Sequence, residues 1–162
     1  MSDNVTPFRN VKLVSLLWAE PDRAAEIARL HAQIFKPAWD EAAIRSLLEH
    51  PASTSLVAVA GAPKSVIGFV IGQLAADEAE ILSVGVTPDW QRIGLGRMLV
   101  EGLARASRRG DAKQLHLEVG ADNAAALALY RALGFKEMRR RKSYYERAGA
   151  PAVDAVVFAL DL

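Results

Sequence analysis

Apolar residues recur along this chain with two periods, one typical of β-strands and one typical of α-helices. Alternating or continuous apolar runs predict strands at 11–18, 55–60, 65–73, 79–86, 113–119 and 153–160, with another in the basic segment around 139–142. Apolar residues spaced three and four apart predict helices at 24–35, 39–50, 95–108 and 123–133. End signals agree, because Asp22 can cap the first helix, Pro51 follows the second and Gly134 can close the last.

The order of these elements predicts the fold class. One strand, two helices, three strands, a helix, a strand, a helix and two strands make a mixed α/β (α+β) domain. We expect a mainly antiparallel central sheet with helices on both of its faces. Residues 11–162 then form a single domain, long enough to bury a core, and residues 1–10 form a loose N-terminal end.

Composition narrows the possible functions. Hydrophobic residues make up 51% of the chain, which is typical of an ordered domain. The absence of cysteine excludes disulfides, thiolate metal sites and a cysteine nucleophile, and the three histidines lack metal-ligand spacing, so we expect no metal. A formal net charge of +1 favours no direct contact with nucleic acid. No apolar run reaches a membrane span of about 18 residues and no secretory signal is visible, so we expect a cytoplasmic protein.

A glycine-rich turn between the predicted strand 79–86 and the predicted helix 95–108 carries the clearest chemical signal. It consists of Gln91, Arg92, Ile93, Gly94, Leu95, Gly96 and Arg97. Glycine lets the backbone approach an anion closely, and the first amides of a helix have no partners within the helix. Such a turn binds phosphate, with arginines adding positive charge. Arg97-Met98 after Gly96 excludes a P-loop, and Leu99 argues against a dinucleotide fingerprint.

Gln91, Gly94 and Gly96 fill a pattern that resembles the coenzyme A pyrophosphate loop of the GNAT N-acetyltransferase superfamily. The second half of the chain is also similar to that superfamily, with its succession of Leu-Glu-Val at 117–119, Asn-Ala-Ala-Ala at 123–126, Leu-Tyr at 129–130 and Leu-Gly-Phe at 133–135. More narrowly, it resembles the ribosomal-protein-alanine N-acetyltransferases, whose closing Arg-Arg-x-Tyr-Tyr has a near match at 140–145. The likeness covers about 30–160 and is most specific at 80–145.

The resemblance implies a GNAT-like fold and acetyl-CoA as co-substrate. It assigns the pantetheine arm to the free backbone of Val84, Gly85 and Val86, on a strand that splays from its neighbour, and to the side chain of Asn123. One of the strand amides could then stabilise a developing oxyanion. The alternative for Gly85 is an ordinary strand glycine retained for packing.

The resemblance also implies the two residues that move protons. Alternation places Glu118 with His116 on one face of its strand, where a partly desolvated carboxylate can serve as general base. Glu80, on the preceding strand, is the rival base. Tyr130 follows Asn123 by seven residues on one helix face and could protonate the leaving thiolate. The alternatives are a surface carboxylate for Glu118 and a core residue for Tyr130.

These residues predict an acetyl-CoA-dependent N-acetyltransferase that acts on a protein N-terminal amine, with the N-terminal alanine of a ribosomal protein as the first acceptor to consider. Two alternatives are a GNAT enzyme for a small amine, such as an amino acid, polyamine or drug, and a non-catalytic acyl-CoA-binding module. One departure bears on the acceptor, because Gly120 stands where the resembled enzymes often carry arginine. The sequence leaves the oligomeric state open.

Overall fold

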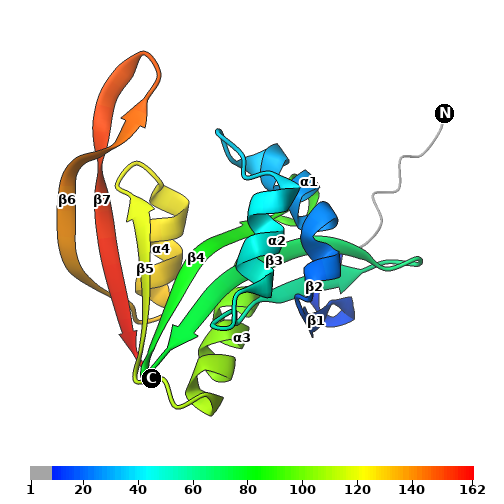
Figure 1. Ribbon diagram of the computed structural model, residues 1–162. Helices are drawn as coiled ribbons and strands as arrows, with labels where there is room; N and C mark the ends of the chain where they lie inside the picture. The colour runs from blue at the N-terminus through cyan, green and yellow to red at the C-terminus, as the bar shows by residue number, and fades with distance from the viewer. Residues whose placement is uncertain (1–8) are drawn as a thin grey trace.

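The computed structural model describes residues 9–162, so residues 1–8 of the loose end predicted at 1–10 lie outside the described residues (Figure 1). Its strands are β1 (Ser15–Trp18), β2 (Leu56–Ala60), β3 (Ser65–Ala75), β4 (Glu78–Val86), β5 (Gln114–Gly120), β6 (Lys136–Arg147) and β7 (Ala150–Asp161). Its α-helices are α1 (Ala24–Ile34), α2 (Glu41–Glu49), α3 (Leu95–Arg109) and α4 (Ala124–Ala132). Short 3₁₀ turns occupy Val11–Leu13, Pro21–Arg23 and Pro88–Trp90.

The strands form one sheet in the order β1-β2-β3-β4-β5-β7-β6. Every neighbouring pair is antiparallel except β4 and β5, which are parallel and are joined by the crossover through α3. The predicted fold class is therefore confirmed, as is the order of the elements. None of the helices in residues 9–162 is both long and apolar enough to cross a membrane.

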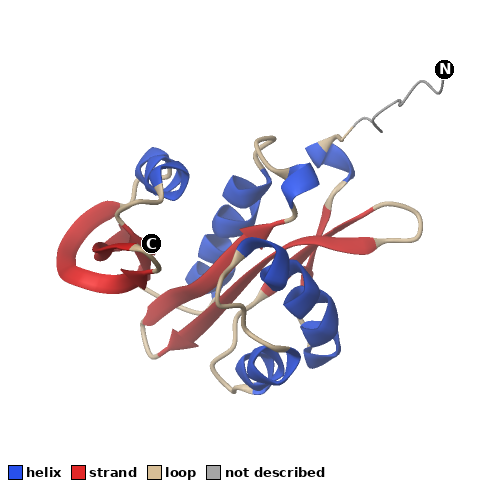
Figure 2. Ribbon diagram, turned by 90° about the horizontal axis from the view of Figure 1, so that it is seen from above, coloured by secondary structure: helices blue, strands red, loops and turns tan. Residues whose placement is uncertain are grey.

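Helices cover both faces of the sheet, and each face has its own hydrophobic core (Figure 2). Strand β2 shows how this arises, because all five of its residues are buried. Leu56, Ala58 and Ala60 pack into the core beneath α3 and α4, whereas Val57 and Val59 pack beneath α1 and α2. We refer to these faces as the α3–α4 face and the α1–α2 face.

Two predicted boundaries near the N-terminus are wrong. The strand predicted at 11–18 begins only at Ser15, because the Asn10 side chain accepts a hydrogen bond from the Lys12 amide and initiates a 3₁₀ turn. Asp22 does not cap α1 but lies inside the 3₁₀ turn Pro21–Arg23 that precedes it. By contrast, the helix predicted at 39–50 is present as α2, and Asp40 caps it by accepting a 2.8 Å hydrogen bond from the Ala43 amide.

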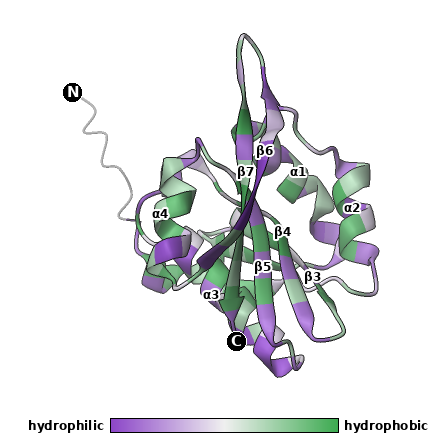
Figure 3. Ribbon diagram, turned by 90° about the vertical axis from the view of Figure 1, so that its left-hand side faces the viewer, coloured by the Kyte–Doolittle hydropathy of each residue, from purple (hydrophilic) through white to green (hydrophobic). Residues whose placement is uncertain are grey.

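The last two strands form a long hairpin that projects beyond the rest of the sheet (Figure 3). Strand β6 is hydrophilic, and nearly all of its residues are exposed. Strand β7 carries the hairpin on the sheet, because it pairs with β5 along seven consecutive residues, from Gln114–Asp161 to Gly120–Ala155. The tip of the hairpin, where β6 ends and β7 begins, therefore lies near the junction of β5 and α4.

Candidate active site

Strands β4 and β5 pair only at one end and then diverge, which opens the sheet (Figure 1). Their pairing runs from Glu78–Gln114 to Ile81–Leu117 and stops there. At the same level β4 has a register shift against β3, because Ile71 pairs with Ser83 and Gly72 pairs with Ile81, leaving Leu82 as the extra residue. A bulge of this kind bends its strand. We call this point the fork.

Beyond the fork, the three predicted pantetheine-binding residues of β4 keep their pairing with β3. Val84, Gly85 and Val86 lie opposite Val70, Phe69 and Gly68. Within residues 9–162, no strand pairs with their other edge, so backbone groups along that edge face the gap.

Close packing explains why residue 85 is glycine, and the strand has no bulge at this position. A Cβ atom at this position would lie 2.8 Å from the Phe69 ring and 3.0 Å from Ile34. The irregularity that bends the strand is at Leu82 instead.

The glycine-rich turn leads from β4 into α3 with two left-handed residues. Arg92 has φ 64° and Gly94 has φ 91°, and the Gln91 amide group donates a 2.9 Å hydrogen bond back to the Val86 carbonyl. Gly94 is the N-cap, and its carbonyl accepts from the Met98 amide at 3.0 Å. The three amides before Met98 therefore have no partner within the helix. A Cβ at Gly94 would meet no atom within 4 Å, so the turn is open where an anion would approach.

Glu118 is the first residue of β5 beyond the fork, and it lies on the α1–α2 face. Its side chain is 24% exposed. Oε2 lies 3.7 Å from the Arg141 guanidinium, while Oε1 is buried with no hydrogen-bond partner in residues 9–162. A buried acceptor without a partner is uncommon and calls for a reason. The Nε2 atom of His116, two residues earlier on the same face, is also buried and unpartnered within that range.

The rival carboxylate, Glu80, is in a different setting. It is exposed, and it pairs in register with His116 in the closed part of the sheet. Both carboxylates line a hollow of about 300 Å³ on this face, together with His116, Arg139 and Arg141. Only Glu118 combines partial burial with a position at the fork.

Tyr130 and Asn123 lie on the opposite face from Glu118. Tyr130 is 4% exposed and packs edge-on against Phe135 at 5.5 Å between ring centroids. Burial raises the pKa of the Tyr130 hydroxyl to about 12. Asn123 caps α4 by accepting a 3.1 Å hydrogen bond from the Ala126 amide, which leaves its own NH₂ group free to donate. The predicted base and acid can therefore meet only through the gap between β4 and β5.

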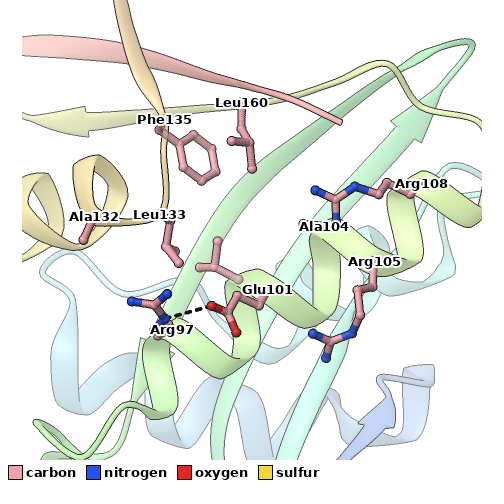
Figure 4. Close-up of a pocket in the computed structure, with 10 residues that line it drawn as sticks. Arg97, Glu101, Ala104, Arg105, Arg108, Ala132, Leu133, Phe135 and Leu160 are labelled. Carbon is pink, nitrogen blue, oxygen red and sulfur yellow. Dashed lines mark hydrogen bonds and ion pairs between the residues drawn. The ribbon is translucent and has the colours of Figure 1, made fainter.

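A second hollow, of about 380 Å³, lies between α3 and the C-terminal end of α4 (Figure 4). Phe135 and Leu160 form one side of it, and Arg97, Arg105 and Arg108 approach it from α3. Sequence reasoning did not predict this hollow. The sequence did contain a signal for it. The three arginines are separated by three, eight and eleven residues, and positions with these separations lie on one face of a helix. Arg97 is paired with Glu101 at 2.8 Å.

Sequence reasoning also missed how the β6–β7 hairpin reaches the site. Tyr145 and Arg147 are the partly buried residues of β6, in contrast to their exposed neighbours. Arg147 binds Asp122, 25 residues earlier, in the turn between β5 and α4. The basic segment around 139–142 predicted a strand here and the resemblance at 140–145 also drew attention to it, but neither gave a position for Arg147.

Comparison with known proteins agrees with this geometry. Residues 24–135 match the model of the acetyltransferase (GNAT) family. Over 94 residues the chain is 46% identical to the [ribosomal protein bS18]-alanine N-acetyltransferase of Salmonella typhimurium, a match that covers 58% of this chain and 63% of that enzyme. The chain thus spans less than two thirds of that relative. It is also 35% identical over 148 residues to the N-alpha-acetyltransferase RimI of Mycobacterium tuberculosis, covering 88% and 89% of the two chains.

Solved structures show the same relationship. The crystal structure of the ribosomal-protein-S18-alanine N-acetyltransferase from Escherichia coli superposes with a TM-score of 0.83 at 31% identity, covering 91% of this chain and 93% of that one. Arabidopsis thaliana NAA60 in complex with a bisubstrate analogue shares the fold at 19% identity, with a TM-score of 0.79 and coverage of 92% and 99%. The forked sheet, the turn at Gly94 and these matches lead to one conclusion, that the chain belongs to the GNAT family of acetyltransferases.

Proposed function

We propose that this protein transfers the acetyl group of acetyl-CoA to the N-terminal amine of a protein in the cytoplasm, with the N-terminal alanine of a ribosomal protein as the preferred acceptor. The observation that carries the proposal is Glu118, a partly buried carboxylate at the fork whose Oε1 is buried and unpartnered within residues 9–162. The names of the Salmonella and Mycobacterium relatives, both N-acetyltransferases, support the acceptor class.

The α3 side of the gap would hold the donor. The turn at Gln91–Arg97 presents the free first amides of α3 to the pyrophosphate, and the open edge of Val84, Gly85 and Val86 offers backbone groups to the pantetheine arm. The free NH₂ of Asn123 can hold the same arm from α4. One of the β4 amides, aimed at the thioester oxygen, would stabilise charge there, a contact that contributes roughly 3 kcal/mol in well-studied enzymes.

The β5 side would handle the proton of the acceptor. An α-amino group titrates near about 8, so much of it is protonated at neutral pH. Glu118 Oε1 accepts that proton, and the amine nitrogen then forms a bond with the carbonyl carbon of the donor. As the bond between that carbon and sulfur breaks, the thiolate leaves with the electron pair.

The leaving thiolate needs a proton, and Tyr130 can supply it from the α3–α4 face. The amine nitrogen loses its second proton as the amide forms, and that proton restores the Tyr130 hydroxyl. Because burial raises the pKa of Tyr130 to about 12, its hydroxyl remains protonated at neutral pH and is available as a donor. The base and the acid thus act from opposite faces of the sheet. This division suits a reaction in which the amine and the coenzyme enter from different sides.

A panel of acceptors tests the proposal. The purified protein is incubated with acetyl-CoA and an alanine-starting peptide, the same peptide with its amine blocked, a polyamine, or no acceptor, and thiol release is measured. We expect release with the free peptide only, and mass spectrometry should place the acetyl group on its N-terminal nitrogen. Release with the polyamine alone would support the small-amine alternative. Acetyl-CoA binding without release on any acceptor would support a non-catalytic module.

A further inference from the structure

Gly120, where β5 ends, leaves space for an ion pair that joins two distant parts of the chain. The Arg147 guanidinium binds the Asp122 carboxylate through two parallel hydrogen bonds, Nε to Oδ2 at 2.9 Å and Nη2 to Oδ1 at 3.0 Å. A Cβ atom at Gly120 would lie 2.6 Å from Asp122 Oδ1 and 2.9 Å from Arg147 Nη2. Gly120 does not need a left-handed backbone, so its role here is to leave space for the pair.

This pair adds to the few contacts that hold β6 in this region, which include the pairing of Tyr145 with Val153 and a 2.9 Å hydrogen bond from the Ser143 amide to Asp154. Pairing of β6 with β7 is regular only from Arg139–Val157 to Arg141–Ala155, after which the register shifts twice before Arg147. Ser143 lies within the first of these shifts and has a positive φ of 50°. Side chains of β6 are almost all exposed, so apolar burial does not fix the strand either. A bidentate pair adds the geometric specificity that the interrupted ladder lacks.

Tyr145 is the residue that the pair positions. The Arg147 guanidinium lies over the Tyr145 ring, 5.5 Å from its centroid, and the ring edge comes to 3.7 Å from the Cβ position of Gly120. Burial, and next the negative charge of Glu118, raise the pKa of the Tyr145 hydroxyl. Gly120 follows Glu118 by two residues on the same face of β5, so the Tyr145 ring lies on the side of the strand that carries Glu118.

We infer that Asp122 and Arg147 form a latch that holds the end of the β6–β7 hairpin against the β5–α4 turn and so positions Tyr145 beside Glu118, where the acceptor amine binds. Arg147 is thus a positioning residue for the acceptor, an inference that rests on the proposed function. Both partners are partly exposed, at 37% for the Arg147 side chain and 47% for Asp122. Exposed ion pairs add little to stability, so the latch governs geometry rather than melting temperature.

The latch predicts a specific kinetic pattern. Arg147→Gln and Asp122→Asn should each raise KM for the alanine-starting peptide by about 10-fold, less than the ~100-fold that a 1 Å misplacement can cost. KM for acetyl-CoA should stay the same, because the donor side is untouched. The double variant should be no worse than either single one, since both remove the same pair. Gly120→Ala should raise the same KM while keeping both charges.

Arg140→Gln is the matched control, because it breaks an exposed ion pair with Glu137 on the same strand without touching Gly120. It should leave both KM values unchanged. Equal effects of Arg140→Gln and Arg147→Gln, or single-variant effects that multiply in the double variant, would overturn the latch.

Hydrogen exchange separates failure of the latch from failure of the proposed function, because it needs no turnover. In Arg147→Gln, amides at 144–149 should exchange faster than in the wild-type protein, whereas Arg140→Gln should leave them unchanged. Faster exchange in Arg147→Gln, with no peptide turnover by the wild-type protein or any variant, would support the latch but contradict the proposed peptide acceptor. Unchanged exchange in Arg147→Gln would reject the latch even if the wild-type protein acetylates peptides.

Discussion

The two sides of the gap between β4 and β5 are built in different ways. The β4–α3 side relies on backbone geometry, with a bulge at Leu82, left-handed residues at Arg92 and Gly94, and free amides at the start of α3. The β5 side relies on side chains, with a carboxylate at the fork and ion pairs that reach it from a hairpin. A donor that is the same in every turnover suits a site made of backbone. An acceptor that must be discriminated suits side chains, which can change without altering the fold.

The largest effect is expected on the β5 side, at Glu118. Glu118→Gln keeps the shape of the side chain but removes the proton acceptor, so turnover at pH 7 should fall by roughly 10²–10⁴-fold. Partial recovery is expected at higher pH, where free amine is more abundant. Glu80→Gln, at an exposed carboxylate of the same hollow, serves as the control. The pH–rate profiles of both variants distinguish between the two candidate bases. A larger loss of turnover in Glu80→Gln would identify Glu80, on β4, as the base.

The next effect concerns the proton donor. Tyr130→Phe retains the ring and its packing against Phe135 and Phe158 but removes the hydroxyl. Turnover should fall by roughly 10²-fold, the lower end for a group that transfers a proton. Acetyl-CoA affinity and melting temperature should change little. Turnover within about twofold of the wild-type rate would make Tyr130 only a core residue.

A smaller and different effect is expected on the β4–α3 side. Gly94→Val should raise KM for acetyl-CoA, because a branched side chain would enter the open space of the turn at φ 91°. Strain alone would also affect the protein, so Gly61→Val is the matched control, with φ 95° in the turn between β2 and β3. Both variants should lose a similar amount of stability. Only Gly94→Val should lose affinity for the coenzyme, by about 10-fold or more.

The smallest effect is expected on stability, from a residue in the core beneath α1 and away from the gap. His31 is 2% exposed, stacks on Trp39 and accepts a hydrogen bond from the Trp39 amide on Nδ1. Desolvation lowers the pKa of His31 in the folded protein. Its stabilising contribution is therefore present above the unfolded pKa of about 6.5 and is lost as the pH falls through the lower folded value.

The melting temperature should accordingly decline by several degrees from pH 7 to pH 5. His31→Leu should lower the melting temperature at pH 7 and flatten its dependence on pH. A dependence as steep in His31→Leu as in the wild-type protein would show that another group controls acid stability.

Much of the fold could be predicted because its signals are local. The two-residue and three-to-four-residue periods identified every strand of the sheet and every α-helix, with boundaries mostly within a few residues. A predicted boundary was wrong where a side-chain hydrogen bond overrides the apolar period. At Asn10, the side chain accepts a hydrogen bond from the Lys12 amide and turns the chain before β1. The turn at Gly94 could be predicted for the same reason, since its glycines and the following helix are contiguous.

The relation between distant residues could not be predicted. Alternation separated Glu118 from Leu117, but it could not show that Glu118 and Tyr130 lie on opposite faces, because that depends on how α4 folds back over β5. The sequence left open whether Gly85 is retained for packing, because its close approach to Phe69 becomes visible only after β3 and β4 pair. The ion pair between Asp122 and Arg147 spans 25 residues and leaves no periodic signal.

The measurement that tests the division of the gap most directly is acetyl-CoA affinity, determined by calorimetry for Gly94→Val and Glu118→Gln alongside the wild-type protein. If the β4–α3 side holds the donor and the β5 side moves the proton, Gly94→Val should bind acetyl-CoA at least about 10-fold more weakly. Glu118→Gln should bind it as the wild-type protein does, despite its loss of turnover. Wild-type affinity in Gly94→Val, or weakened binding in Glu118→Gln, would contradict this assignment of the two sides.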